Sequence, residues 1–228
     1  MIAAPSALGC VVKMRVIAVS VGLPRNVTWR GRVVQTSIFK DPVAGRVRVE
    51  QLNLEGDRQS DLTVHGGAEK AVYVYPSEHY AFWRDELPGV ELPWGSFGEN
   101  LTTEGLDEGV HVGDRILIGS ASFVVTQPRM PCYKLALRFD RLDIIKRFLQ
   151  SGRTGFYLSV SQEGELAAGD AVTLQPGDAS VTIADIVNLY AADASNQELL
   201  RRASQVVALP EAWRDYFRER LWEPDSKE

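Results

Sequence analysis

The sequence predicts a mainly β fold, an antiparallel barrel or sandwich with two inserted helices, followed by a small three-helix C-terminal extension. Three observations support this prediction. Most of the chain consists of short β-branched or aromatic runs separated by glycine turns. Two segments within that part carry apolar residues at helical spacing. The last part of the chain changes to amphipathic patterns with capping residues.

Seven segments have the β-branched or alternating character of strands. They are residues 16–21, 46–49, 71–75, 115–118, 122–126, 155–160 and 171–174. Two of these strands begin alike, because "GDRILIG" and "GDAVTLQ" both start with Gly-Asp and continue with alternating apolar residues. We therefore expect one kind of turn to introduce both strands.

Two helices are expected between the strands. Residues 76–87, "PSEHYAFWRDEL", place three large apolar side chains on one helical face, namely Tyr80, Trp83 and Leu87. Residues 141–152, "RLDIIKRFLQSG", end in Gly152, a typical C-cap residue. The expected apolar face of this second helix consists of Leu142, Ile145 and Leu149.

Three amphipathic helices are expected at the end of the chain. Residues 181–190 carry Ile183, Ile186, Val187 and Tyr190. Residues 195–209 open with Ser195 and Glu198, which form the pattern of a capping box. Residues 210–221 start with Pro210 and continue with a stripe of Trp213, Phe217 and Leu221. We interpret these stripes as core packing, and the extension as a lid, a partner surface or a homodimer contact.

The expected domains are a tail of residues 1–13, a β domain over 14–177 and the helical extension over 178–228. Met14 directly precedes the first strand and is an alternative translation start to Met1.

Composition excludes several classes of protein. The 228 residues are 45% hydrophobic and 24% charged, enough for one substantial core. A net charge of −5 gives no basic footprint for a nucleic-acid polymer. No apolar stretch approaches the roughly 20 residues that a membrane helix needs, and the N-terminus lacks a signal-peptide pattern. We therefore expect a cytoplasmic protein without a membrane partner.

The cysteines and histidines do not form a recognisable metal motif. Cys10 and Cys132 cannot build a disulfide framework, and no CxxC or CxxH spacing offers a zinc site. His65, His79 and His111 lie on different expected elements without an HxxxH pair. Cys132 stands in "QPRMPCYKL", residues 127–135, where prolines stiffen the chain before a hydrophobic run.

Polar side chains gather in two glycine-rich stretches. In residues 56–75, Gly66 and Gly67 let backbone amides approach a ligand and form an anion nest. The charged and polar residues around them are Asp57, Arg58, Asp61, His65 and Lys70. In residues 97–106, Glu99 and Asn100 occupy a turn, and an amide such as Asn100 can both donate and accept along a heterocycle.

The order of "GDRQSDLTVHGG", "FGENLT", "GD" and "QPRMPC" resembles the MOSC family, the domain named for the C-terminal part of molybdenum-cofactor sulfurase. The resemblance is closer to its stand-alone bacterial YiiM-like branch, and it covers residues 16–174. The three trailing helices are similar to the helical extension of that branch. The resemblance implies a MOSC-type β-barrel that binds the molybdenum cofactor (Mo-molybdopterin), with Cys132 as a sulfur ligand to molybdenum.

The cofactor that the resemblance implies suits these residue types. A thiolate is a soft ligand for a transition metal, and the charge of Arg129 favours the thiolate and suits the pterin phosphate. The remaining expected phosphate contacts are Lys70, Arg58, Gly66 and Gly67. The expected pterin contacts are Asn100, Glu99, Asp61 and His65. An equal alternative for His65 is that it only holds its loop by a hydrogen bond, and His79 and His111 are left out as structural or exposed.

Three functions are compatible with this interpretation. The YiiM-like branch resembles enzymes that reduce small N-hydroxylated bases, such as hydroxylaminopurines, to amines. A second function is sulfur transfer through a Cys132 persulfide, which would need a pyridoxal-phosphate desulfurase for which 228 residues leave no room. A third is cofactor binding and delivery without turnover. We favour the reductase, and because the sequence has no GxGxxG and no ferredoxin-like cysteine run, a separate electron-donating reductase is expected as partner.

Overall fold

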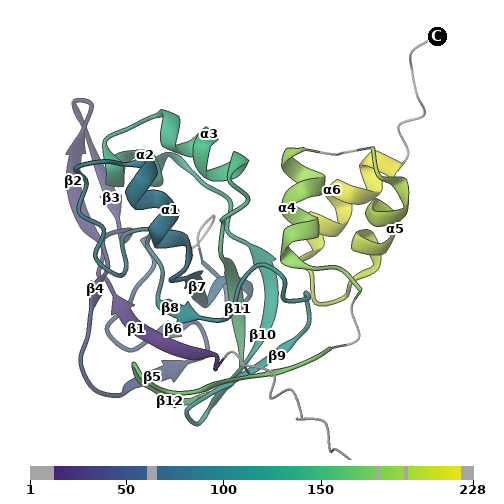
Figure 1. Cartoon of the computed structure of the whole chain (residues 1–228), viewed down its shortest axis with the longest axis horizontal. Helices are drawn as coiled ribbons and strands as arrows, with labels where there is room; N and C mark the ends of the chain where they lie inside the picture. The colour runs from purple at the N-terminus through teal and green to yellow at the C-terminus, as the bar shows by residue number, and fades with distance from the viewer. Residues whose placement is uncertain (1–12, 61–65, 178–179, 193–194, 222–228) are drawn as a thin grey trace, which may run out of the picture.

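The computed structural model describes residues 13–60, 66–177, 180–192 and 195–221 (Figure 1). A curved sheet with helices near one end forms the larger part of the molecule, and the three C-terminal helices lie beside β9 and β10. None of the helices in these ranges is long and apolar enough to cross a membrane.

Within the described residues, the largest sheet has eight strands in the order β13-β9-β10-β11-β7-β8-β1-β4. Their bounds are β1 Arg15–Val21, β4 Asp41–Pro42, β7 Val72–Pro76, β8 Leu101–Glu104, β9 Arg115–Ile118, β10 Ala121–Pro128, β11 Phe156–Gln162 and β13 Val172–Gln175. All seven predicted strand segments overlap strands of the structure. The mainly β prediction is therefore confirmed.

The sheet curls, but its strand order is not a closed ring. The Val172 N–H donates to the Met14 carbonyl at 2.9 Å, and the Val16 N–H donates to the Asp170 carbonyl at 3.0 Å. These bonds bring the start of β1 against the start of β13. One strand pair differs from the expected antiparallel arrangement, because β7 and β8 are parallel. Parallel neighbours need a crossover connection, and this one contains α1.

Two smaller sheets accompany the main one among the described strands. One joins β12 Gly164–Leu166, β5 Val47–Glu50 and β6 Asn53–Leu54. The other is the hairpin of β2 Arg25–Trp29 and β3 Arg32–Thr36, which was not predicted from the sequence. Its two-residue turn has positive φ at Arg30 and Gly31, the geometry that twists tightly paired strands correctly. Strand β3 of this hairpin leads directly into residues 36–40.

The helices of the β domain are α1 His79–Glu86, α2 Tyr133–Phe139 and α3 Asp143–Gln150, with a short 3-10 turn η1 at Ala68–Lys70. The expected face of α1 is buried. In α3 the buried residues are Ile144 and Phe148, whereas Leu142 is 52% exposed. The expected face was wrong because Phe148 stacks on Trp83 and Tyr75, so α3 turns Ile144 and Phe148 toward the aromatic cluster. Helix α2 was not predicted from the sequence pattern.

The repeated Gly-Asp pattern forms the same turn twice. The Asp114 carboxylate accepts the His111 N–H at 2.8 Å, and the Asp170 carboxylate accepts the Ala167 N–H at 2.9 Å. In both cases a carboxylate binds the backbone amide three residues earlier, as polar side chains in turns commonly do. The two strands that follow, β9 and β13, pair with each other.

The C-terminal extension consists of α4 Ile183–Ala191, α5 Gln197–Gln205 and α6 Glu211–Leu221. The predicted helices after Val181 are confirmed. The expected cap at Ser195 was wrong, because α5 begins at Gln197 and the residue before it is Asn196. The Asn196 side chain accepts the Leu199 N–H at 3.0 Å.

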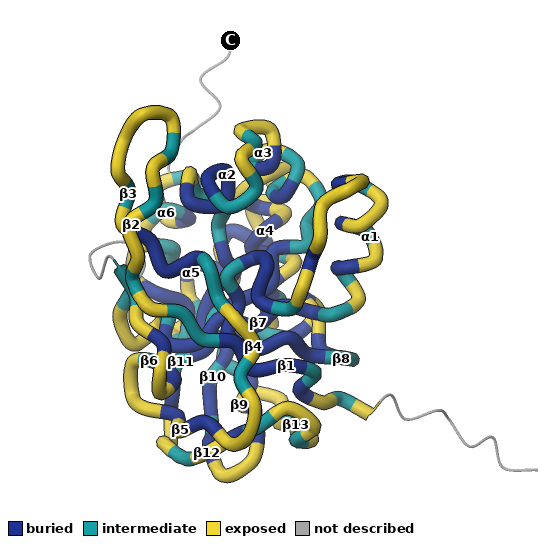
Figure 2. Tube along the Cα trace, turned by 90° about the vertical axis from the view of Figure 1, so that its left-hand side faces the viewer, coloured by how far each residue is buried: buried dark blue, intermediate teal, exposed yellow. Residues whose placement is uncertain are grey.

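Two buried clusters stabilise the fold (Figure 2). The larger cluster joins residues of the sheet, such as Phe123, to residues of the extension, such as Leu200 and Phe217. The aromatic stripe of the extension thus packs on the sheet. The second cluster lies around Trp83 and Phe148, under α1 and α3.

Candidate functional site

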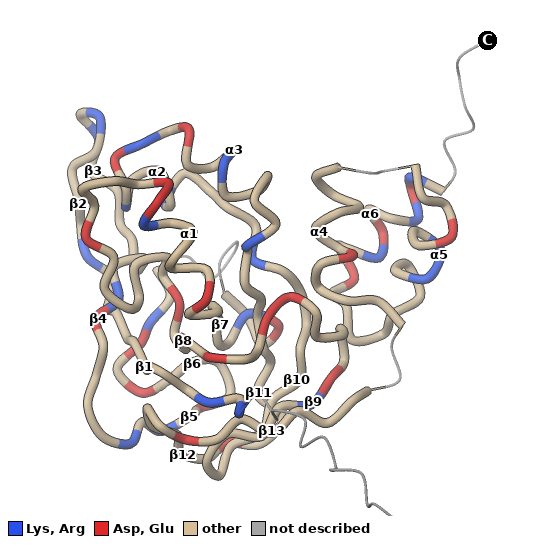
Figure 3. The backbone as a smooth tube through the Cα atoms, viewed as in Figure 1, with Lys and Arg blue, Asp and Glu red and all other residues tan. Residues whose placement is uncertain are grey.

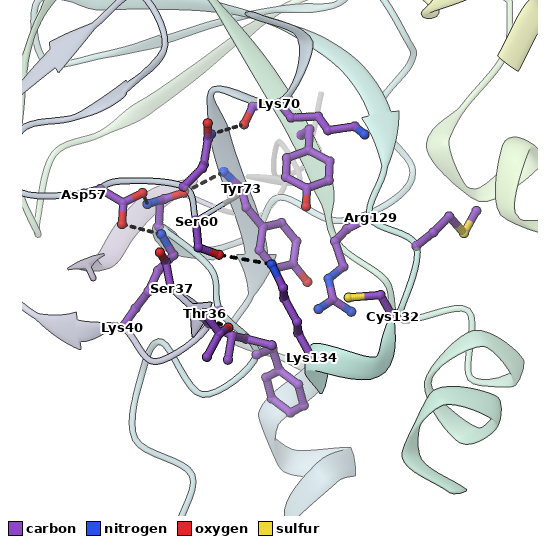
Figure 4. Close-up of a pocket in the computed structure, with 17 residues that line it drawn as sticks. Thr36, Ser37, Lys40, Asp57, Ser60, Lys70, Tyr73, Arg129, Cys132 and Lys134 are labelled. Atoms are coloured by element: carbon purple, nitrogen blue, oxygen red, sulfur yellow. Dashed lines mark hydrogen bonds and ion pairs between the residues drawn. The ribbon is translucent and has the colours of Figure 1, made fainter. Parts of the chain in front are cut away.

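A pocket opens where the ends of β3 and β10 meet η1 and the start of α2 (Figure 4). Four of the residues that the sequence predicted for the site line it: Lys70, Asn100, Arg129 and Cys132. These residues come from three separate segments of the chain. Asp57, Gln59 and Ser60 also line the pocket, so the described start of "GDRQSDLTVHGG" meets the "FGENLT" and "QPRMPC" regions there.

Arg129 and Cys132 lie side by side in the pocket. Figure 4 shows the Cys132 sulfur directed toward the Arg129 guanidinium. Arg129 is only 5% exposed, and its guanidinium lies over the rings of Tyr73 and Phe148 at 5.7 and 5.2 Å. Cys132 is partly exposed, so its thiol can meet a ligand. Among the described residues, the Arg129 Nη1 group is buried without a hydrogen-bond partner.

The charge of Arg129 is secured by its neighbours. Burial disfavours the charge, but the phenols of Tyr73 and Tyr157 and the thiol of Cys132 raise the pKa of Arg129 above its ordinary value. Burial also raises the pKa of Tyr73 and Tyr157, and the charge of Arg129 opposes this. Arg129 therefore places a positive charge beside the Cys132 thiol. Its Nη1 group has no hydrogen-bond partner among the described residues.

Lys40 and Asp57 form a buried ion pair in the pocket wall. Their Nζ and Oδ1 atoms are 2.5 Å apart. Asp57 also accepts the Gly22 N–H at 2.8 Å and the Asn100 side-chain amide at 2.9 Å. Burial lowers the pKa of Lys40, and Asp57 opposes that effect. Asp57 thereby fixes the position of Lys40.

Asn100 lines the pocket, but its side-chain amide is already hydrogen-bonded within the protein. Its Oδ1 accepts the Tyr73 N–H at 3.1 Å, and its Nδ2 donates to Asp57. The expected donor and acceptor pair for a heterocycle is therefore engaged in joining β7 to the Asp57 loop.

Two further polar side chains face the pocket. Lys134 Nζ donates to Ser60 Oγ at 3.0 Å, and since an ammonium has three donors, it retains capacity for a ligand. The Ser37 Oγ is buried and has no partner in the described part of the chain. With Arg129 Nη1, the pocket thus contains two buried polar groups that an anion could satisfy.

The Lys70 loop borders the pocket on another side. Gly67 has φ +100°, a conformation that side chains rarely adopt, and its carbonyl accepts the Lys70 N–H at 3.0 Å. Gly66 precedes it and is half-buried. The Lys70 carbonyl accepts the Gln59 side-chain amide at 3.0 Å, and burial lowers the pKa of Lys70.

Of the described residues that the sequence predicted for the site, four do not line the pocket: Arg58, Gly66, Gly67 and Glu99. Arg58 is exposed and does not line it. Asp61 and His65 lie outside the described residues.

Glu99 is fully buried away from the pocket. Its carboxylate accepts hydrogen bonds from the Gly95 and Phe97 N–H groups, the Thr102 hydroxyl and the Tyr80 hydroxyl. These four bonds shape the turn that precedes Asn100.

Three polar residues of the pocket were not predicted from the sequence: Ser37, Lys40 and Lys134. A signal existed in "TSIFKDP", where hydroxyl residues and a lysine follow one another between two strands. For Lys134 no local signal existed, since a lysine in a short helix is usually exposed.

The pocket is basic although the chain is acidic. The described residues that line it include one carboxylate, Asp57, and four cationic side chains: Lys40, Lys70, Arg129 and Lys134. Elsewhere basic and acidic residues are interspersed along the backbone (Figure 3). A concave cluster of cations attracts an anionic ligand. Within the described ranges, no group of three or more His, Cys, Asp and Glu side chains is placed to hold a metal ion.

Comparisons with known proteins agree with this architecture. A family model described as MOSC domain matches residues 61–173, and one described as YiiM-like, 3-alpha helix domain matches residues 181–222. YflK of Bacillus subtilis (strain 168) is 38% identical over 206 residues, which cover 89% of this chain and 92% of YflK. The crystal structure of YiiM from Geobacillus stearothermophilus has a TM-score of 0.76 and 35% identity, covering 91% of this chain and 99% of that chain.

A fungal protein matches over a shorter region. A protein named Reductase, from Gibberella moniliformis (strain M3125 / FGSC 7600), is 34% identical over 148 residues. The match covers 63% of this chain and 26% of that protein.

The chain combines a curled sheet, a thiol in a basic pocket and three trailing helices. The chain belongs to the MOSC domain family. Within that family its sheet and its extension match the YiiM-like branch, as the order of the motifs predicted.

Proposed function

We propose that this protein binds the molybdenum cofactor in the pocket around Arg129 and Cys132 and reduces small N-hydroxylated bases to amines. Cys132 is the protein ligand to molybdenum in this proposal, and a separate reductase supplies the electrons. The observation that carries the proposal is the pairing of a partly exposed thiol, Cys132, with the buried guanidinium of Arg129 in a basic pocket.

The donors of the pocket fit the phosphate of a pterin cofactor. Arg129 Nη1 and Ser37 Oγ are buried without partners among the described residues, and a phosphate oxygen would satisfy such groups. Lys40, Lys70 and Lys134 add positive charge around them. A cation in a partly buried site interacts strongly with an anion. We therefore expect the phosphate to bind near Arg129, Ser37 and these lysines.

The thiol suits the metal. A cysteine sulfur binds molybdenum only as the thiolate, and the adjacent Arg129 charge favours that form. The guanidinium is itself fixed by the Tyr73 and Phe148 rings beneath it, and the Arg129 backbone N–H donates to the Gly155 carbonyl at 3.2 Å. The chain therefore presents the sulfur from a rigid support.

When bound, molybdenum supplies the two-electron redox chemistry that N–O bond cleavage requires. The residues of the chain bind the cofactor, hold Cys132 as a thiolate and leave the pocket open for a small substrate. The fungal relative named Reductase supports a redox reaction, and that protein is much longer than the matched region. The 228 residues contain no GxGxxG motif of the kind that binds a flavin or nicotinamide, which supports an external electron donor.

The proposal is tested on protein made in a host that synthesises the cofactor. Molybdenum is measured by metal analysis, and the pterin by its fluorescence after oxidation. The expected result is about one molybdenum and one pterin per chain, together with reduction of an N-hydroxylated base when an electron donor is added.

Other outcomes favour the alternatives or overturn the proposal. A cyanide-releasable sulfur on Cys132 without molybdenum would indicate a persulfide carrier. Bound cofactor without any turnover would indicate a binding and delivery protein. Protein that retains neither molybdenum nor pterin overturns the proposal.

A further inference from the structure

A hydrogen-bonded connection runs from the C-terminal extension to the Lys70 loop. Trp213 of α6 donates its indole N–H to the Gln127 side-chain oxygen at 3.0 Å. The Gln127 side-chain amide donates to the Glu69 carbonyl at 3.4 Å. Glu69 is the residue before Lys70 in η1, and Lys70 lines the pocket. Two side chains thus link helix α6 to one side of the candidate site.

The indole of Trp213 determines which way the Gln127 side-chain amide is oriented. An indole N–H can only donate, so the group that faces Trp213 must be the oxygen of the Gln127 amide. The amide nitrogen of Gln127 is then turned toward the Glu69 carbonyl. Gln127 is only 4% exposed, so water does not readily replace either bond. Trp213 therefore selects the orientation in which Gln127 supports η1.

The Glu69 carbonyl is held from a second side. The Thr126 hydroxyl donates to it at 2.7 Å. Thr126 and Gln127 belong to β10, which continues directly to Arg129. The strand that carries the guanidinium therefore also positions the lysine loop, and the two sides of the pocket share one support.

Trp213 is placed by the packing of the extension. Its ring lies 5.6 Å from Tyr190 and 5.6 Å from Phe217, measured between ring centroids, and 6.0 Å from Tyr216. Phe217 is completely buried in the core shared with the sheet. Because these rings fix the indole, the extension as a whole determines where its N–H points.

We infer that Trp213 and Gln127 are positioning residues through which the C-terminal extension fixes the Lys70 side of the site. The extension thus supports the pocket in addition to any role as a partner surface. The importance of this support for cofactor retention rests on the proposed function, whereas its effect on the order of the loop does not.

The test compares three single variants of the full chain and the double variant of Trp213→Phe with Gln127→Met. Trp213→Phe keeps an aromatic ring but removes the N–H, and Gln127→Met removes both bonds at similar side-chain length. Tyr216→Phe is the matched control, since it alters the same ring cluster without touching Gln127. Amide hydrogen exchange of residues 66–71 is measured together with the free energy of unfolding.

Trp213→Phe is expected to accelerate exchange in residues 66–71 by roughly 2- to 10-fold, the effect of one lost hydrogen bond. Gln127→Met should do at least the same, and the double variant should exceed Gln127→Met by little, because both changes break one connection. Tyr216→Phe should leave the segment unchanged. Unchanged exchange in both single variants, or an acceleration spread equally over the whole chain, overturns the inference.

Cofactor content separates the two proposals. If the chain binds the cofactor, Trp213→Phe should also retain less pterin than Tyr216→Phe. If the wild type holds no pterin while exchange in residues 66–71 changes as expected, the proposed function fails and the positioning role stands.

Discussion

The Lys40 ammonium lies 2.5 Å from the Asp57 carboxylate, and both side chains are nearly inaccessible, at 9% and 1% exposure. Asp57 also binds the Gly22 N–H and the Asn100 amide. One carboxylate thus joins the segment after β3, the end of β1 and the "FGENLT" turn. Such a pair is costly to break, because the remaining charge stays buried.

Asp57→Asn should destabilise the protein by about 3 kcal/mol, near the lower end for a broken buried pair because Lys40 can lose its proton instead. The free energy of unfolding in urea measures this. The loss should shrink as pH rises, since a neutral Lys40 needs no counter-charge. Asp41→Asn, an exposed neighbour, is the control. Equal stabilities of the two variants would show that the pair is not important for the fold.

Lys70→Ala should lower cofactor retention by about 10-fold or more, the cost of a lost charge-assisted hydrogen bond. Arg58→Ala should leave retention unchanged, because Arg58 is exposed and does not line the pocket. Pterin content after gel filtration measures both variants. Equal losses from the two substitutions would mean that general charge, and not the pocket, holds the cofactor.

Anion binding should weaken with rising pH earlier than an ordinary lysine would predict. Burial lowers the pKa of Lys70, with Glu69 opposing, so the charged form that attracts an anion is lost at a lower pH than in an exposed lysine. Sulfate is the suitable probe, because its own charge is constant over this range. In Lys70→Arg the decline should move to higher pH, since arginine stays protonated. Superimposable pH profiles for the two proteins would contradict a role of Lys70 in anion binding.

Glu99→Gln should destabilise the fold by about 1–3 kcal/mol, because its carboxylate accepts two backbone N–H groups and two hydroxyls that an amide cannot all satisfy. Cofactor affinity of the folded protein should stay within a factor of about two, since Glu99 does not line the pocket and a lost hydrogen bond costs affinity only where the group meets the ligand. Thermal unfolding and pterin content measure the two effects. If the Glu99→Gln variant were stable but lost the pterin, Glu99 would be a ligand-binding residue after all.

Local sequence patterns predicted those parts of the fold that depend on interactions between residues close together in the chain. The Gly-Asp turns at Asp114 and Asp170 follow from a carboxylate that binds a nearby amide. The parallel pairing of β7 with β8 was not predictable in this way, because it depends on how the chain crosses over between distant segments.

The residues of the site also divide into those that a local motif predicts and those that depend on tertiary packing. Arg129 and Cys132 were predicted because they share one short motif, and the structure places them together. Lys40 and Lys134 were missed because only tertiary packing buries a lysine. Glu99 was expected to contact a ligand, since a sequence does not reveal that backbone amides already occupy its carboxylate.

The proposed ligation of molybdenum by Cys132 is tested by Cys132→Ser in protein that carries the cofactor. Serine is a harder and poorer ligand than a thiolate. The variant should lose the metal, or keep the pterin with an altered molybdenum absorption and paramagnetic spectrum, and reduction of an N-hydroxylated base should collapse in either case. Full reductase activity of Cys132→Ser, with molybdenum bound and its spectrum unchanged, would show that Cys132 does not ligate the metal.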